Sequence, residues 1–185
     1  MADEVGLGKT IEAGHIMLEL KARGELTNVL IVCPKSLREK WYNELKEKFG
    51  LVFEIYEKTE DLIDDLDNKN GAVRGIINYE KIRLKNIDEG SSEEKKKKKR
   101  VNDITDYLVE NNKRFSLLIC DEAHKLRNED TQQYRGAERL MDCVDSAVFL
   151  TATPIMLNSR NLYNILHLLD NVKYYNPGLC NILST

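Results

Sequence analysis

The chain has 185 residues, of which 42% are hydrophobic and 32% are charged, so it can form one globular domain with a core and is not disordered as a whole. Its formal net charge of −3 argues against a protein that holds nucleic acid through its overall field, so any such contact must come from local basic groups. The four cysteines form no CxxC pair, and no stretch has the pattern of a membrane span or a signal peptide. These features argue against a zinc site, a disulfide scaffold and a membrane protein, and they suit a reducing cytosol.

The first feature in chain order is the stretch Gly6-Leu7-Gly8-Lys9-Thr10, which has the chemistry of a phosphate-binding loop. Its glycines let the backbone curl so that successive N–H groups point at an anion. Lys9 would then reach the β- and γ-phosphates of a nucleotide, and Thr10 would hold a magnesium ion. The loop alone is equally compatible with a plain turn before a helix.

The surroundings of this loop are complete on one side only. Residues 11–20 have a helical pattern, so that a helix N-terminus would face the phosphates. A full phosphate-loop pattern has a glycine where this chain has Asp3, and two residues before Asp3 are too few for a strand. We therefore expect that the chain is truncated before the strand that leads into the loop.

Short apolar runs rich in β-branched residues recur between stretches of helical periodicity. Such runs suit strands that are buried on both faces, and their alternation with helices predicts an α/β fold with a mostly parallel sheet and helices on both faces. Sites in such sheets form at the carboxyl ends of the strands. The predicted strands are 29–32, 51–56, 75–77, 117–120 and 147–150, and the predicted helices follow apolar stripes in 37–49 (opened by Ser36), 62–66, 101–108 and 162–169.

Residues 89–100 interrupt this alternation with a glutamate- and serine-rich stretch, which leads into five lysines and an arginine. Runs of like charge usually stay in water, so we expect an exposed, solvated insertion. A contact with nucleic acid or with a partner is the alternative.

The predicted strand 117–120 ends in Asp121-Glu122-Ala123-His124. A carboxylate at the tip of a buried strand is where an α/β nucleotide enzyme needs one, because Asp121 could hold magnesium together with Thr10. Glu122 could orient and deprotonate an attacking water. Two acidic residues by themselves are often only a solvated strand end. In combination with the loop at 6–10, they are a far more specific signal than either part.

Three segments in order, GLGKTIEAG, ICDEAH and LTATP, resemble motifs one, two and three of the superfamily-two helicases, and DEVGLGKT is similar to the Swi/Snf family of DNA-dependent ATPases. That family has an acidic residue in place of the first loop glycine, so Asp3 fits it. Residues 31–37 with Trp41 resemble motif Ia, and 76–80 resemble a strand-end segment that touches DNA. The resemblance spans 3–170, and the sequences of the motifs are most similar to those of bacterial members such as the RNA-polymerase-associated type.

The resemblance implies that 1–185 are the first RecA-like lobe of an ATPase that moves along double-stranded DNA and remodels protein–DNA complexes. ATP and Mg²⁺ would be its cofactors, with Lys9 and Glu122 as catalytic residues. The implied partners are double-stranded DNA, a second RecA-like lobe, and RNA polymerase or another DNA-bound protein, in the cytoplasm of a bacterium and associated with the nucleoid, without a membrane. Because the second lobe supplies arginines, we expect the isolated chain to hydrolyse ATP poorly.

The resemblance also assigns residues outside the phosphate loop. Some would meet the DNA backbone without reading sequence, and others would couple the nucleotide site to DNA. The first group is Lys35, Ser36, Asn78 and Tyr79, and the second is His124, Thr151 and Thr153. Structural roles are the alternative, since Ser36 suits a helix N-cap, Tyr79 could cover the core and His124 could satisfy a local hydrogen bond. For the whole chain, the alternatives are a non-catalytic DNA- or partner-binding module and an NTPase unrelated to nucleic acid.

Overall fold

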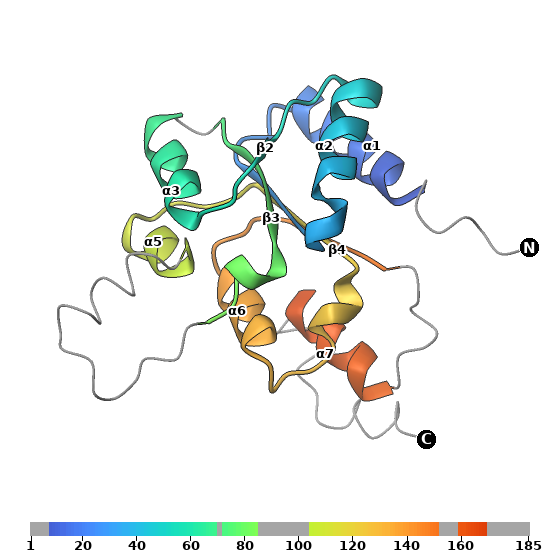
Figure 1. Ribbon diagram of the computed structural model, residues 1–185, viewed down its shortest axis with the longest axis vertical. Helices are drawn as coiled ribbons and strands as arrows, with labels where there is room; N and C mark the ends of the chain where they lie inside the picture. Colours follow the sequence, from blue (N-terminus) through green and yellow to red (C-terminus); the bar gives the residue numbers. More distant parts are fainter. Residues whose placement is uncertain (1–7, 70–71, 85–103, 152–158, 170–185) are drawn as a thin grey trace, which may run out of the picture.

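The computed structural model describes residues 8–69, 72–84, 104–151 and 159–169, and it is an α/β domain built on one sheet (Figure 1). The strands lie in the order β2-β3-β1-β4-β5, and every neighbouring pair is parallel. This confirms the predicted fold class; the predicted insertion at 89–100 lies outside the described residues. The strands are β1 (Val29–Cys33), β2 (Glu54–Ile55), β3 (Arg74–Asn78), β4 (Leu117–Asp121) and β5 (Ala147–Leu150).

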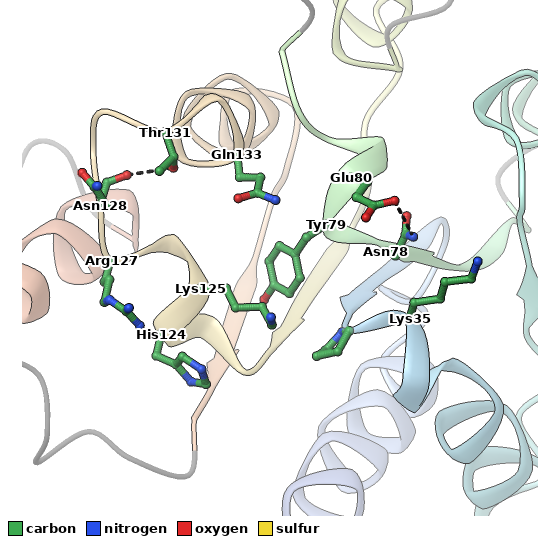
Figure 2. Close-up of a pocket in the computed structure, with 11 residues that line it drawn as sticks. Lys35, Asn78, Tyr79, Glu80, His124, Lys125, Arg127, Asn128, Thr131 and Gln133 are labelled. Atoms are coloured by element: carbon green, nitrogen blue, oxygen red, sulfur yellow. Dashed lines mark hydrogen bonds between the residues drawn. The ribbon is translucent and has the colours of Figure 1, made fainter.

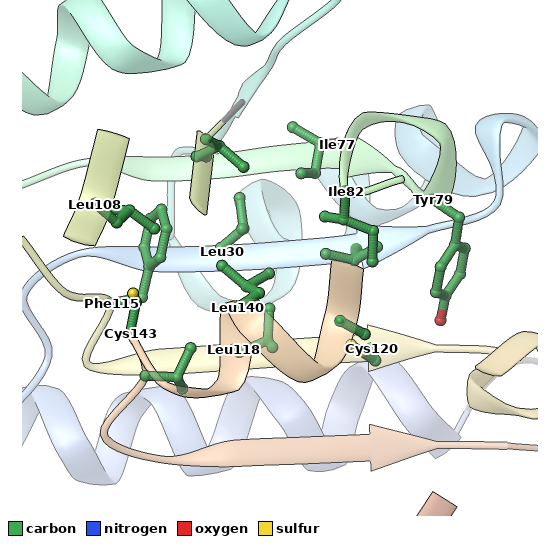
Figure 3. Packing of buried hydrophobic residues seen from close by; sticks show 14 of the residues in the cluster. Leu30, Ile77, Tyr79, Ile82, Leu108, Phe115, Leu118, Cys120, Leu140 and Cys143 are labelled. Carbon is green, nitrogen blue, oxygen red and sulfur yellow. The ribbon is translucent and has the colours of Figure 1, made fainter. Parts of the chain in front are cut away.

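Helices cover both faces of the sheet because its central strands alternate their side chains between two hydrophobic clusters. In β1, Val29, Ile31 and Cys33 join one cluster, and Leu30 and Val32 join the other. The first cluster is covered by α1 (Gly8–Ala22) and α2 (Arg38–Phe49), and the second by α3 (Thr59–Asn68), α5 (Ile104–Glu110), α6 (Gln132–Met141) and α7 (Ser159–Leu169). Figure 3 shows the packing of the second cluster against β1, β3 and β4. Within the described ranges, none of these helices is both long and apolar enough to cross a bilayer.

The predicted strand 51–56 is much shorter in the structure, where β2 contains only Glu54–Ile55. The reason is the end of α2. Gly50 adopts the left-handed conformation with φ 61°, and the N–H groups of Gly50 and Leu51 donate to the carbonyls of Lys46 and Leu45. This is a Schellman-type helix ending. Its hydrogen bonds engage N–H groups at the start of the predicted strand, so they are not available for pairing with a neighbouring strand.

The start of α2 also differs from the prediction. Ser36 does not cap this helix, because residues Lys35–Leu37 form a short 3-10 turn, η1, and α2 begins only at Arg38. The turn closes by a hydrogen bond from Leu37 N–H to the Pro34 carbonyl, 2.9 Å long. Ser36 is therefore left exposed on the turn that follows β1.

Helix α6 was not predicted, and its attachment to the sheet depends on a glycine. Its first turn is capped by Thr131, whose hydroxyl accepts from Tyr134 N–H at 3.2 Å. A Cβ at Gly136 would lie only 1.7 Å from the Ile82 carbonyl oxygen, so the helix approaches the segment after β3 as only glycine permits. That segment begins with a second 3-10 turn, η2 (Tyr79–Lys81).

Candidate active site

The structure brings the two halves of the predicted nucleotide site into direct contact. Lys9, in the first turn of α1, places its Nζ 2.5 Å from Glu122 Oε1 and 3.1 Å from Asp121 Oδ1, although Lys9 and Glu122 are 113 residues apart in sequence. Thr10 follows on the same turn and is 3% exposed. The first turn of a helix carries backbone N–H groups without intrahelical partners and the positive end of the helix dipole. The arrangement is therefore cationic on the α1 side and anionic at the end of β4.

Lys9 is charged in this arrangement. Burial by itself would lower the pKa of its ammonium group, but the hydrogen bonds to Glu122 and Asp121 outweigh burial and raise the pKa above its ordinary value. The ammonium is thus neutralised by two neighbouring carboxylates. An anionic ligand must compete with these carboxylates for Lys9.

Glu122 has an unusual backbone, with φ 54° and ψ 47°, which is the left-handed region. For a residue with a side chain this conformation costs about 1–2 kcal/mol. Its N–H donates to Asp121 Oδ1 at 2.9 Å, and its carboxylate meets Lys9. Strained residues of this kind occur preferentially at functional sites. The left-handed conformation of Glu122 turns the chain sharply at the end of β4, where the 3-10 turn η3 (Ala123–Leu126) begins.

Asp121 is 4% exposed and is held by two buried donors that come from other elements. The indole N–H of Trp41, on α2, donates to Asp121 Oδ2 at 2.9 Å. The hydroxyl of Tyr79, on η2, donates to the Asp121 carbonyl oxygen at 2.7 Å. Burial raises the pKa of Tyr79 well above its ordinary value, so the hydroxyl keeps its proton. The sequence interpretation missed the contact of Trp41, although a buried indole N–H generally requires a partner.

Of the residues expected to couple the site to DNA, His124 and Thr151 lie at the same edge of the sheet. His124 Nδ1 is 3.2 Å from Glu122 Oε2, without the geometry of a hydrogen bond. Thr151 directly follows β5. Gly6, Leu7 and Thr153 lie outside the described residues.

Beside these carboxylates, a pocket of about 480 Å³ lies over the carboxyl ends of β1, β3 and β4 (Figure 2). It contains three of the four residues expected to contact DNA, and Ser36 is the one that does not line it. Its cations outnumber its single carboxylate, Glu80, by three to one. The sequence interpretation missed Lys125 and Arg127, which η3 and the following loop place opposite Lys35. The lining consists of Pro34, Lys35, Asn78, Tyr79, Glu80, His124, Lys125, Arg127, Asn128, Thr131 and Gln133.

Asn78 is the most unusual polar group of this pocket. It is 5% exposed, and its Oδ1 has no hydrogen-bond partner, while its Nδ2 lies 3.5 Å from Glu80 Oε2. Buried polar atoms are nearly always paired, so this unpaired amide oxygen on the pocket wall is an acceptor that a hydrogen-bond donor could satisfy.

Comparisons with known proteins show the family of this chain. Residues 1–178 match the model of the SNF2-related domain. The chain belongs to the SNF2-related domain family. It is 33% identical over 180 residues to the RNA polymerase-associated protein RapA of Actinobacillus pleuropneumoniae serotype 3 (strain JL03) and 30% identical over 178 residues to that of Serratia proteamaculans (strain 568). Each alignment covers 95% of this chain but only 18% and 17% of the relatives, so the chain spans less than a fifth of their length.

A solved structure supports the fold of this SNF2-related domain. The Sulfolobus solfataricus SWI2/SNF2 ATPase core in complex with dsDNA matches with a TM-score of 0.65 at 23% identity, over 91% of this chain and 30% of that chain. The similarity confirms the RecA-like fold. The Lys9, Asp121 and Glu122 cluster therefore lies in a domain of a Swi/Snf-like ATPase family.

Proposed function

We propose that this chain, 1–185, is the ATP-binding lobe of a DNA-dependent ATPase that moves along double-stranded DNA and remodels protein–DNA complexes. The observation that carries the proposal is the contact of Lys9, at the N-terminus of α1, with Asp121 and Glu122, at the end of β4. A cation at a helix N-terminus beside a pair of strand-end carboxylates is the arrangement that phosphoryl transfer requires. Membership of the SNF2-related domain family supports it.

The residues present fit ATP with Mg²⁺. Lys9 would bind the phosphates, and Thr10 and Asp121 would hold the metal, together with the glycine-containing loop Gly6-Leu7-Gly8. In the described part of the chain no group of three or more His, Cys, Asp and Glu side chains could hold a metal alone. Magnesium suits such a site because it is usually bound by one or two carboxylates with substrate phosphates and water. When bound, the ion would neutralise charge on the phosphates, and Glu122 would accept the proton of the attacking water.

The pocket beside this site would receive the DNA backbone. Lys35, Lys125 and Arg127 supply positive charge, and Asn78 supplies an amide whose Nδ2 can donate to a phosphate. Contacts of this type position a duplex and do not depend on its sequence. Ser36 would join them from the exposed turn η1, and His124, Thr151 and Thr153 would couple the two sites.

The nucleotide site can be tested by the binding of a fluorescent ATP analogue with Mg²⁺. We expect Lys9→Met and Asp121→Asn each to weaken binding by about 10- to 150-fold, because each removes one charge-assisted contact worth about 1.5–3 kcal/mol. Lys21→Met is the matched control, since Lys21 is an exposed lysine in the last turn of the same helix. Equal affinity of the Lys9→Met and Lys21→Met variants would refute the proposed site, provided that both unfold at the temperature of the native chain.

The proposal also includes a second lobe and a DNA-bound partner, which this chain does not supply. A second RecA-like lobe would provide arginines, so the isolated chain should hydrolyse ATP about 10³-fold or more slowly than a complete enzyme. RNA polymerase or another DNA-bound protein would be the object of remodelling, in the bacterial cytoplasm and at the nucleoid. RapA relatives in bacteria support this placement.

The basic pocket also favours a second candidate, a binding module without catalysis. A labelled DNA duplex that binds in a salt-sensitive way, with the same affinity in the presence and absence of nucleotide, would favour the binding module over the motor lobe.

A further inference from the structure

We propose that Tyr79 is a positioning residue that connects the basic pocket to Asp121, so that a DNA backbone in the pocket changes the setting of this carboxylate. This inference deepens the proposed function and rests on it. It assigns Tyr79 a different task from direct contact with DNA, because its one hydroxyl proton is already donated inside the protein.

Tyr79 takes part in both sites at once. It lies in the pocket wall between Asn78 and Glu80, which also line the pocket, and Figure 2 shows its ring between these residues and Lys125. Its side chain is nearly inaccessible to solvent, and its hydroxyl donates to the Asp121 carbonyl at 2.7 Å. A shift of η2 caused by a pocket ligand therefore acts directly on the backbone of Asp121.

The bond joins two strands that are not neighbours in the sheet. Tyr79 follows β3 and Asp121 ends β4, and β1 lies between these strands. The tyrosine thus reaches across the end of β1, next to Lys35 and the turn η1. The hydrogen bond thus links the η2 side of the pocket to the end of β4 across β1.

Asp121 cannot move without disturbing other contacts. Its Oδ1 accepts from Glu122 N–H and lies 3.1 Å from Lys9 Nζ, and its Oδ2 accepts from Trp41. Both carboxylate oxygens are thus engaged. A small displacement of the Asp121 backbone must change the contact with Lys9 or the contact with Trp41.

Asn78 gives the pocket a means to act on this link. It directly precedes Tyr79, and its buried Oδ1 has no partner. A DNA phosphate can only accept, so it would bind the Nδ2 group of Asn78, whose present contact with Glu80 Oε2 is long at 3.5 Å. Because no bond holds the amide oxygen, the amide can turn toward the phosphate, which moves Asn78. The movement is passed to the next residue, which is Tyr79.

The chain contains an intrinsic fluorescent reporter for the position of the Asp121 carboxylate. Trp41 is the only tryptophan, and its indole N–H is bonded to the carboxylate concerned. Because it is 2% exposed, a ligand in the pocket cannot quench it by contact. A change in its emission on addition of DNA therefore reports a change inside the domain.

The test compares the native chain with Tyr79→Phe, which removes only the hydroxyl. Binding of a labelled short duplex is followed by anisotropy, and Trp41 emission is followed with the unlabelled duplex at saturation. Tyr107→Phe is the matched control, because Tyr107 is also a nearly buried tyrosine whose hydroxyl donates to a carboxylate, that of Asp67, away from the site. We expect the native chain and Tyr107→Phe to show an emission change, and Tyr79→Phe to bind the duplex without it.

A second measurement gives the size of the link. The duplex should raise the affinity for the fluorescent ATP analogue, and we expect Tyr79→Phe to reduce this factor by up to about tenfold, the range of one hydrogen bond. An equal emission change in Tyr79→Phe and Tyr107→Phe overturns the link but leaves the proposed function intact. If the native chain binds the duplex without any emission change, the link is also overturned and the proposed function is intact. This outcome needs only the native chain, so it counts even if Tyr79→Phe does not fold. A native chain that does not bind the duplex overturns both.

Discussion

Replacement of Gly136 by alanine should destabilise the domain more than an added methyl group usually does. The new Cβ would lie 1.7 Å from the Ile82 carbonyl oxygen and 2.8 Å from its carbon, whereas real contacts of a Cβ start near 3.0 Å. Both partners are backbone, so α6 must move away from the segment after β3 by more than about 1 Å. That movement also strains the hydrogen bond from Leu84 N–H to the Gln132 carbonyl, which joins the same two segments.

The size of the effect follows from these contacts. Overpacking costs about 1–3 kcal/mol, and a lost hydrogen bond adds about 1 kcal/mol. Alanine offsets about 1 kcal/mol of this through its higher helix propensity. We therefore expect Gly136→Ala to lower the free energy of unfolding by about 1–3 kcal/mol, a large part of the roughly 5–15 kcal/mol of an ordinary domain.

Urea denaturation, followed by circular dichroism and by Trp41 emission, measures this loss. Gly8→Ala is the control without a clash, because nothing lies within 4 Å of the added Cβ. Gly14→Ala is an intermediate case, since its Cβ would meet the side-chain ring of Phe49 at 2.3 Å, and a ring can rotate away. If Gly136→Ala unfolds at the same urea concentration as Gly8→Ala, the close approach of α6 does not exist and the reasoning fails.

Three further predictions concern charge. Burial, helped by the Asp121 charge, raises the pKa of Cys33 to about 12 from an ordinary 9.0, so the contribution of this thiol to stability should be constant below pH 9 and fall by about 1.4 kcal/mol per pH unit between pH 9 and 12, as the unfolded thiol ionises. Urea denaturation at several pH values should show a slope that is smaller by this amount in a Cys33→Ala variant, and an unchanged slope in the variant would contradict the prediction. Lys125→Met and Arg127→Met should each reduce the slope of log affinity for duplex DNA against log salt by about 1, as anisotropy titrations can determine. Glu80→Gln removes the single carboxylate of the pocket and should tighten duplex binding; weaker binding would place the backbone elsewhere.

The sequence predicted those parts of the molecule that depend on local pattern. Residues 147–150 and 117–120 are apolar runs and form strands β5 and β4, the latter with one residue more. The sequence combined the loop at 6–10 with Asp121 and Glu122 in one nucleotide site, and the structure places both carboxylates against Lys9. Whether they act on a nucleotide stays a prediction.

The parts that the sequence did not predict depend on distant partners. The end of α2 shortens the strand predicted at 51–56 to β2, and α6 is held by a glycine whose importance appears only when Ile82 is beside it. Tyr79 looks like a surface contact in sequence, but its hydroxyl finds Asp121, 42 residues later. Such pairings are decided by tertiary packing, which no local pattern contains.

The ion contacts of Lys9 have a consequence for the order in which ligands bind. In the free protein the positive charge of its ammonium offsets one of the two negative charges of Asp121 and Glu122, so the three groups together carry one net negative charge. An anion that withdraws Lys9 leaves two adjacent carboxylates without a counterion, and a cation that occupies the carboxylates leaves Lys9 without one. Phosphate and divalent metal should therefore bind with positive cooperativity, each raising the affinity for the other by the same factor. Either ligand alone would have to disrupt the site, and together they restore its balance.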